Sequence, residues 1–281
     1  MSVSFAKGHG TGNDFVILAD DDGHLELSAS TVRALTDRRR GIGGDGLLRV
    51  VPAALSGEPD VVAQAGVAQW FMDYRNADGS IAEMCGNGVR VFAHYLRLTG
   101  RVTETEFHVA TRGGTKLVRV VGDGVYAVTM GGSHVIDSVT PISVRADGRH
   151  WPAVGVALPN PHAVAFVDSL ADAGALDVMP EVAPAAAYPH GTNVEFVRVV
   201  GPAHIEMRVF ERGVGETLSC GTGACAAAWA SRRRAGGSAP SRWQVDVPGG
   251  TVFVDEDERG ILTLSGPAVI VASGTLAEDL L

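Results

Sequence analysis

The pattern of apolar and polar positions predicts a mostly β protein with a helix at the centre of each half. Apolar residues recur at helical spacing in 89–96 and in 224–230. Apolar runs bounded by turn residues follow both segments. The strands predicted from these runs are 106–110, 115–121 and 125–130 in the first half, and 243–247, 251–255 and 261–265 in the second.

The two halves repeat one order of elements, which indicates a diverged duplication. A strand and a turn precede each central helix, the strands being 71–76 and 206–211. Further upstream a helical pattern precedes another strand, and these pairs are 28–40 with 47–51, and 177–188 with 194–200. The main insertion, 52–66, is predicted to be a loop. Each half is therefore expected to contain one buried and one outer helix.

Polar residues mark the expected helix ends. Ser28 and Ser30 can cap the first outer helix. Arginines at 38–40 and 232–234 are expected in last turns, where cations suit the helix dipole. We expect both arginine runs to be solvated helix ends and not nucleic-acid contacts.

Two cysteines open nearly identical glycine turns. Cys85 begins CGNGV and Cys220 begins CGTGA, and each turn leads into a central helix. Unpaired N–H groups and the positive end of the dipole lie at a helix start. This setting is expected to lower the thiol pKa and favour thiolate. Two such cysteines predict a pair of thiols that exchange a proton, whereas Cys225 falls inside the helix as a small core residue.

Composition narrows the class of protein. The 281 residues are 46% hydrophobic with a net charge of −9, which is typical of a globular protein and makes nucleic acid an unlikely partner. No apolar run predicts a membrane span and the first residues do not resemble a signal peptide, so we expect the cytoplasm. Three cysteines do not make a disulfide framework. A pyridoxal enzyme needs a Schiff-base lysine, and the chain offers Lys7 and Lys116.

Residues 41–46, GIGGDG, match the spacing of a dinucleotide-binding loop. That loop requires a strand before it and a helix after it, but here the order is reversed. We therefore expect these glycines to end the first outer helix and form a tight turn lining a cleft.

Several polar residues are candidates for a binding site. Asn13, Asn76, Asn160 and Asn193 are predicted to lie in short turns at matched places of the two halves. Glu211 and Arg212 place an acid and a base side by side just upstream of the second cysteine, either as a surface ion pair or as substrate ligands. His162, close to Asn160, could serve a reactive thiol or simply fill a turn.

The motifs together resemble the diaminopimelate epimerase family. They cover residues 9–224 in order: HGTGNDF from 9, NADGS from 76, MCGNGVR from 84, NPH from 160, GTNVE from 191, ERGVGET from 211 and CGTGA from 220. The resemblance implies an α/β (α+β) fold of two pseudo-symmetric domains, each a curved, mostly antiparallel β-sheet or barrel around a central helix, with the site between them. We expect the domains at 1–129 plus 268–281, and at 130–267. Gly46 stands where some members carry a glutamine.

The resemblance also implies a function. The family interconverts LL- and meso-2,6-diaminopimelate without a cofactor or metal, for lysine and peptidoglycan synthesis, and several members are homodimers. Cys85 and Cys220 would be the catalytic bases. The implied α-carboxylate contacts are Gly86, Asn87, Gly221 and Thr222, those to the α-ammonium are Asn13 and Glu211, and those to the distal end are Asn76, Asn160, Asn193 and Arg212. His162 would support the thiols.

Three other classes of protein remain open at this point. A proline-racemase-like isomerase would share the architecture and the cysteine pair. A thiol redox protein could also use two cysteines, but usually has a Cys-x-x-Cys pair. A metal-binding module could use Cys85, Cys220 and His162, although the sequence shows no fourth ligand.

Overall fold

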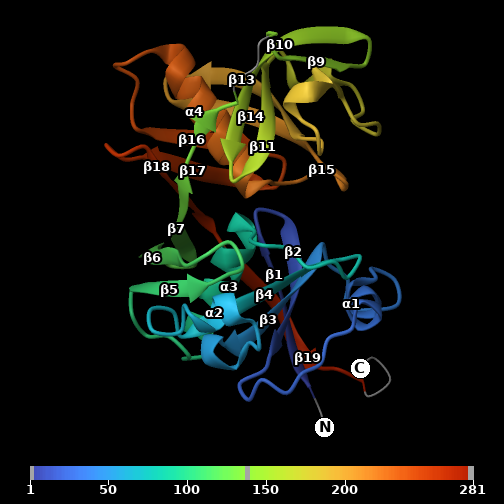
Figure 1. The fold of residues 1–281 in the computed structure, drawn as a ribbon, viewed down its shortest axis with the longest axis vertical. Helices are drawn as coiled ribbons and strands as arrows, with labels where there is room; N and C mark the ends of the chain where they lie inside the picture. The colour runs from blue at the N-terminus through green and yellow to red at the C-terminus, as the bar shows by residue number, and fades with distance from the viewer. Residues whose placement is uncertain (1–2, 137–139, 278–281) are drawn as a thin grey trace. The chain divides into compact units, whose positions relative to one another are not determined.

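The structure, a computed structural model, describes residues 3–136 and 140–277. The chain folds into two compact units (Figure 1). One unit combines Met1–Val128 with Gly266–Leu281, and the other is Thr129–Ser265. Cys85 therefore belongs to the first unit and Cys220 to the second.

The first unit is built on a mixed sheet. Its strands are β1 (Ser4–Gly10), β2 (Asn13–Ala19), β3 (Gly46–Pro52), β4 (Trp70–Asn76), β5 (Glu106–Ala110), β6 (Lys116–Gly122), β7 (Val125–Gly132) and β19 (Val269–Thr275). Hydrogen bonds order them β19-β1-β2-β3-β4-β5-β6-β7. The pairs β2–β3 and β4–β5 are parallel, and the other pairs are antiparallel.

The second unit repeats this order. Its strands are β8 (His134–Val135), β9 (Ser143–Ala146), β10 (Arg149–Leu158), β11 (Asn160–Phe166), β12 (Glu181–Ala183), β13 (Asn193–Gly201), β14 (His204–Glu211), β15 (Gly215–Thr217), β16 (Arg242–Val247), β17 (Gly250–Glu256) and β18 (Ile261–Pro267). The succession β10-β11-β13-β14-β16-β17-β18 has its parallel pairs, β11–β13 and β14–β16, at the positions of β2–β3 and β4–β5. The duplication expected from the sequence is thus present in the strand order.

Both predicted central helices are confirmed. They are α3 (Gly86–Leu98) and α4 (Gly221–Ala235), and each begins directly after its cysteine, which is the N-cap. Helix α3 packs on β1, β2, β3, β4 and β19. Helix α4 packs on β10, β11, β13 and β14, which correspond to β1–β4, and also on β16 and β17. Val89, Phe92 and Leu96 of α3 are fully buried, and each such side chain contributes about 1.5–3 kcal/mol on burial. This packing fixes both helix starts to their sheets.

The first outer helix, α1 (Ala29–Thr36), is shorter than predicted. Ser28 is its N-cap and accepts a hydrogen bond from the Thr31 N–H at 3.0 Å, whereas Ser30 lies within the helix. The expectation that the arginines at 38–40 occupy the last turn is wrong. Asp37 is extended, and its carboxylate accepts the N–H groups of Arg39 and Arg40, which ends the helix early.

The glycines at 41–46 end this segment, as expected. The N–H groups of Ile42 and Gly43 donate to the carbonyl of Leu35 in α1, and Gly43 has a φ of +80°. The segment follows a helix and leads into β3, so it does not form a dinucleotide loop.

The prediction of a second outer helix at 177–188 is wrong. The segment contains β12 and a short 3-10 turn, η3 (Ala185–Ala187), instead. Pro180 and Pro184 interrupt it, because proline donates no backbone hydrogen bond and disfavours helix at the residue before it. The loop predicted at 52–66 also needs correction, since it contains η1 (Ala53–Leu55) and a one-turn helix, α2 (Pro59–Val62), started by Pro59.

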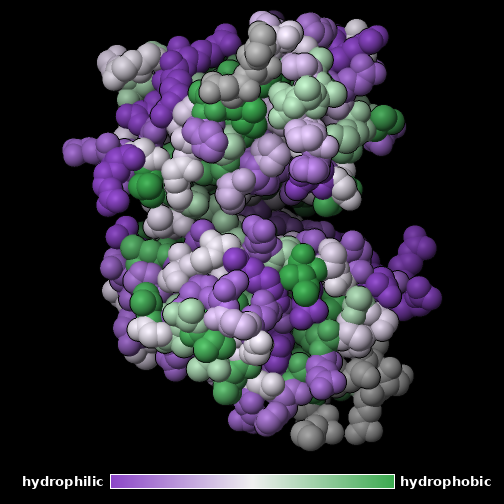
Figure 2. All heavy atoms as spheres, viewed as in Figure 1, coloured by the Kyte–Doolittle hydropathy of each residue, from purple (hydrophilic) through white to green (hydrophobic). Residues whose placement is uncertain are grey.

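The arginines that end α4 are more than a solvated helix end. Arg232 and Arg233 both form ion pairs with Glu256 of β17, which holds the end of α4 against the sheet. On the face shown in Figure 2, hydrophilic residues predominate and hydrophobic residues form small separate groups. Among the described residues, no helix has the length and hydropathy needed to cross a membrane.

Candidate functional site

The four candidate asparagines lie at strand ends and not in isolated turns, which corrects the prediction. Asn13 begins β2, Asn160 begins β11, Asn193 begins β13, and Asn76 ends β4. Each of the four is paired with a residue of a neighbouring strand, which fixes its backbone, and its side chain projects from a face of the sheet. Each sheet therefore holds two amides in defined positions.

In the first unit, Cys85 contacts the amide of Asn13. Its Sγ lies 3.6 Å from Asn13 Oδ1 and accepts the N–H of Gly88 at 3.4 Å. Asn87 donates to the same Oδ1 at 3.3 Å. The Nδ2 of Asn13 donates to Asp45 at 2.8 Å, which turns the amide oxygen toward the thiol. Asp45 belongs to the glycine turn, and its contact with Asn13 was not predicted from the sequence.

Two other positions considered in the sequence, Asn76 and Gly46, pair with each other across β4 and β3. Asn76 donates to Ser80 Oγ at 3.0 Å, within its own turn. Gly46 begins β3, and a Cβ there would lie 2.6 Å from the carbonyl oxygen of Arg75 and 2.7 Å from the ring of Tyr74. The glutamine carried by some proteins of the resembled family does not fit here unless β4 moves.

In the second unit, Cys220 is buried beside the first turn of α4. Its Sγ accepts the N–H of Gly223 at 3.4 Å and lies 3.5 Å from Thr222 Oγ1. Burial raises the pKa of the Cys220 thiol well above its ordinary value, and the carboxylates of Glu211 and Glu195 add to this. The expectation that the helix start lowers this pKa is therefore wrong, because desolvation outweighs the two hydrogen bonds.

Glu211 and Arg212 are adjacent in sequence but serve different neighbours. Burial raises the pKa of Glu211, although hydrogen bonds from Thr217 and Cys220 oppose the effect. Thr217 Oγ1 donates to Glu211 Oε1 at 2.5 Å. The exposed guanidinium of Arg212 donates to the carbonyl of His190 at 3.0 Å, and its backbone N–H donates to Asn193 Oδ1 at 2.9 Å. The side chains of Glu211 and Arg212 thus bond to other groups and not to each other, which does not support a surface ion pair between them.

His162 is fully buried and bonded on both sides of its ring. Nδ1 lies 2.6 Å from Glu195 Oε1, and Nε2 lies 3.0 Å from Asn160 Oδ1. Glu195 is also fully buried, inside β13. No role was predicted for Glu195, although a glutamate within an apolar strand run was a visible signal in the sequence.

The predicted residues thus form local groups within each unit. In the first unit, Asn13, Cys85, Gly86 and Asn87 lie around the start of α3. In the second, Glu211, Cys220, Gly221 and Thr222 lie around the start of α4, while Asn160 adjoins His162 and Asn193 adjoins Arg212.

Pyridoxal chemistry would need a free lysine, and metal chemistry would need a group of ligating side chains. Lys7 Nζ donates to Asp14 at 2.6 Å and to the carbonyl of Gly43, while burial lowers the pKa of Lys116. Within residues 3–136 and 140–277, no three His, Cys, Asp or Glu side chains are grouped to hold a metal ion.

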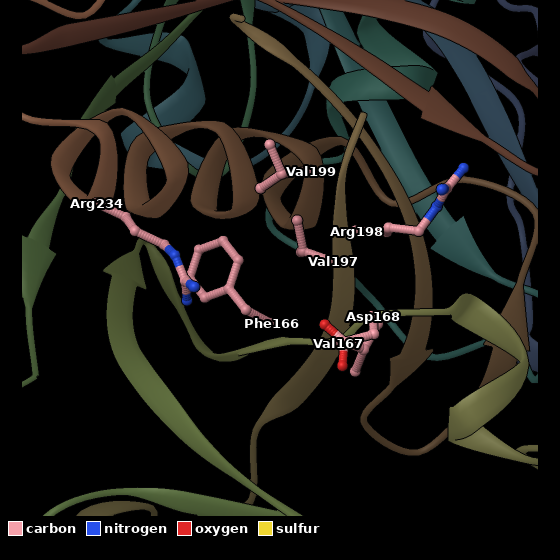
Figure 3. Close-up of a pocket in the computed structure, with 7 residues that line it drawn as sticks. All are labelled: Phe166, Val167, Asp168, Val197, Arg198, Val199 and Arg234. Atoms are coloured by element: carbon pink, nitrogen blue, oxygen red, sulfur yellow. The ribbon is translucent and has the colours of Figure 1, made fainter. Parts of the chain in front are cut away.

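A separate hollow of about 210 Å³ lies at the opposite ends of β11 and β13 from Asn160 and Asn193 (Figure 3). Arg234 covers the ring of Phe166 there, 4.5 Å from its centroid. None of the predicted site residues lines this hollow.

Comparisons with known proteins identify the family of the chain and relate its fold to solved structures. The family model described as diaminopimelate epimerase matches residues 5–136 and 154–271. A diaminopimelate epimerase of Streptomyces coelicolor is 53% identical, with 97% of this chain and 94% of that protein covered. One of Thermobifida fusca is 50% identical, with 97% of each covered.

A crystal structure of a hydroxyproline epimerase from Agrobacterium vitis shares the fold. Its TM-score is 0.67 at 16% identity, with 99% of this chain and 93% of that chain covered. The predicted fold of two pseudo-symmetric α/β halves is thereby confirmed. On the family model and on these close relatives, the chain belongs to the diaminopimelate epimerase family.

Proposed function

We propose that this protein interconverts LL- and meso-2,6-diaminopimelate, with Cys85 and Cys220 as its two acid/base groups and no cofactor. Family membership supports the reaction, and the repeated cysteine caps support the two bases. Each compact unit would be one epimerase half that carries one thiol. We further propose that the enzyme works in the cytoplasm as a homodimer, in the supply of lysine and peptidoglycan precursors.

Epimerisation removes a proton from Cα and returns one to the opposite face. Two bases do this directly when one is a thiolate and the other a thiol. The raised pKa of Cys220 supports a resting state in which Cys220 carries the proton. In the direction that starts from this state, Cys85 takes the Cα proton and Cys220 donates. Glu211 is hydrogen-bonded to Cys220, the thiol that would donate this proton.

The helix starts supply the anion-binding groups that this reaction needs. Backbone N–H groups at the first turn of a helix favour a bound carboxylate and the negative charge that develops on it. We assign the α-carboxylate to the turns that contain Gly86 and Asn87, and Gly221 and Thr222. Asn13 and Glu211 would hold the α-ammonium group.

The distal amino-acid end of diaminopimelate needs its own ligands. We assign these contacts to Asn76, Asn160, Asn193 and Arg212, with His162 in support. A shorter substrate would leave these polar groups unpaired, which disfavours it. This assignment distinguishes diaminopimelate from proline, the substrate class of the alternative isomerase.

The observation that carries the proposal is the pair of cysteine-capped helices at equivalent positions of the two sheets. The test is conversion of LL- to meso-diaminopimelate by wild type, Cys85→Ala, Cys220→Ala and Cys225→Ala. Each of the first two should lose at least about a hundredfold in kcat. Cys225, buried within α4, is the matched control and should keep activity. Near-normal turnover by either capping-cysteine variant would refute the two-thiol assignment, and proline turnover without diaminopimelate turnover would refute the substrate.

A further inference from the structure

The duplicated sheets allow a residue-by-residue comparison of the layer beneath the two helix starts. In the first unit, Phe15 of β2 pairs with Gly46 of β3. In the second, His162 of β11 pairs with Asn193 of β13. Leu48 lies two residues after Gly46 in β3, and Glu195 lies two residues after Asn193 in β13. Phe15 and Leu48 therefore occupy the positions that His162 and Glu195 occupy in the other unit.

The same part of the helix lies over both pairs. A Cβ on Gly88 of α3 would lie 3.5 Å from Leu48 and 3.6 Å from Phe15. A Cβ on the equivalent Gly223 of α4 would lie 2.8 Å from Glu195 Oε1. All four side chains are fully buried. An apolar pair thus fills this space in the first unit, so packing alone does not require a histidine and a glutamate in the second.

The polar pair carries a cost that the apolar pair avoids. Burying a carboxylate is unfavourable unless its oxygens are satisfied, and replacing a buried ion pair with apolar residues is often neutral or stabilising. Glu195 Oε1 binds His162, but within the described part of the chain Oε2 has no hydrogen-bond partner. A costly pair at a position where the duplicate half has Phe and Leu indicates a functional role.

We infer that Glu195 is a positioning residue that acts through His162 on Asn160. Glu195 accepts the Nδ1–H of His162, and the opposite ring nitrogen, Nε2, then faces Asn160 Oδ1. Because this contact engages the amide oxygen, the NH₂ group of Asn160 remains available as a donor. The Tyr188 hydroxyl fixes the backbone of the same strand by donating to the carbonyl of His162 at 3.2 Å.

We call the hydrogen-bonded series Glu195–His162–Asn160 the relay. It gives the second unit a donor for the distal carboxylate of the substrate, and this inference therefore rests on the proposed function. Both ring nitrogens face oxygen atoms, Glu195 Oε1 and Asn160 Oδ1, so the relay requires that each nitrogen donates a hydrogen bond. Cys220, Glu211 and Tyr188 are the titratable groups near the pair. The corresponding apolar pair in the first unit supplies no such relay.

The first test is a double-mutant cycle on kcat and KM for diaminopimelate, with wild type, Glu195→Gln, Asn160→Ala and the combined variant. Glu195→Gln should lower kcat/KM about tenfold, mainly through KM, because a charge-assisted contact in the relay is lost. The combined variant should be no worse than Asn160→Ala alone, because both changes remove one function. Glu206→Gln is the matched control, since Glu206 pairs with Arg198 on the same sheet away from Cys220. Additive effects, or wild-type kinetics in Glu195→Gln, would overturn the inference.

The second test is independent of activity. Nitrogen-15 NMR of the ring of His162 should show a proton on both nitrogens in wild type and loss of that signature in Glu195→Gln. The double variant His162→Phe/Glu195→Leu, which copies the first unit, should fold with a Tm within a few degrees of wild type. Unfolding of this variant, or an unchanged NMR signature in Glu195→Gln, would show that the pair serves packing. Absence of diaminopimelate turnover in wild type would instead refute the proposed function, and the NMR experiment would still test the Glu195–His162 contact.

Discussion

The thiol of Cys85 lies 3.6 Å from the amide oxygen of Asn13, and this contact ties the start of α3 to the start of β2. The orientation of the amide comes from its other end, where Nδ2 donates to Asp45. Arg38 holds Asp45 in turn, at 2.7 Å between Nη2 and Oδ1. The glycine turn at 41–46 therefore reaches the candidate site through one carboxylate.

Replacing Asp45 should impair activity with little effect on the fold. In Asp45→Ala, the amide of Asn13 can rotate and present its NH₂ group to Cys85. We expect a three- to tenfold loss in kcat/KM, about the value of one hydrogen bond, with a near-normal Tm because Asp45 is partly exposed. Steady-state kinetics and thermal unfolding check this. Asp21→Ala removes another exposed ion pair, with Arg101, and should be silent. Equal activity in both variants would contradict the role of Asp45.

Arg212→Ala should weaken substrate binding more than it weakens the fold. The exposed guanidinium contributes one hydrogen bond, to the carbonyl of His190, so its removal costs little stability. Loss of a charge-assisted contact to a carboxylate should lower kcat/KM by about ten- to a hundredfold. Arg198→Ala, on the neighbouring strand, is the control. A lower Tm at unchanged specific activity would make Arg212 structural.

Asp73 should make the stability of the first unit depend on pH. Burial alone would raise the pKa of Asp73, but ion pairs with Arg75 and Arg112 outweigh it and hold the pKa below its usual value. A lowered carboxyl pKa gives stability that is present above the unfolded value, about 3.8, and is lost as the pH falls through the folded value. Asp73→Asn should be less stable at neutral pH and lose less on acidification. Denaturant unfolding between about pH 6 and pH 2 measures both. Parallel curves for the two proteins would disprove this coupling.

Activity should survive removal of metal ions and pyridoxal phosphate. The proposed reaction uses only side chains and backbone N–H groups, and Lys7 is engaged by Asp14. The measurement is turnover after dialysis against a chelator, on protein without pyridoxal absorbance. Activity lost on dialysis and restored by a metal or by pyridoxal phosphate would require another mechanism.

Local signals in the sequence were enough to predict the central helices and most strands. A glycine turn after a cysteine, followed by apolar residues at helical spacing, defines α3 and α4 because capping and burial act in the same direction. The prediction for 177–188 failed where these signals conflict. Its alanines favour helix, but Pro180 and Pro184 remove backbone donors and leave β12 and a single turn.

The polar network behind the cysteines was harder to predict because it depends on register. Glu195 and His162 are far apart in sequence and meet because β11 and β13 pair in parallel. The effect of burial on Cys220 was missed for a related reason. The helix start is visible in the sequence, whereas desolvation and the nearby carboxylates depend on packing across the sheet.

The central claim, that two separate thiols exchange the Cα proton, is tested most directly by the isotope pattern of turnover in D₂O. Each thiol equilibrates with solvent, so the thiol that donates should deliver deuterium from the first turnovers. Mass spectrometry at low conversion should find deuterium at Cα of the newly formed epimer, and mostly protium in the remaining substrate. A single base that serves both faces would return the original proton, so substantial protium in the early product would contradict the two-thiol mechanism.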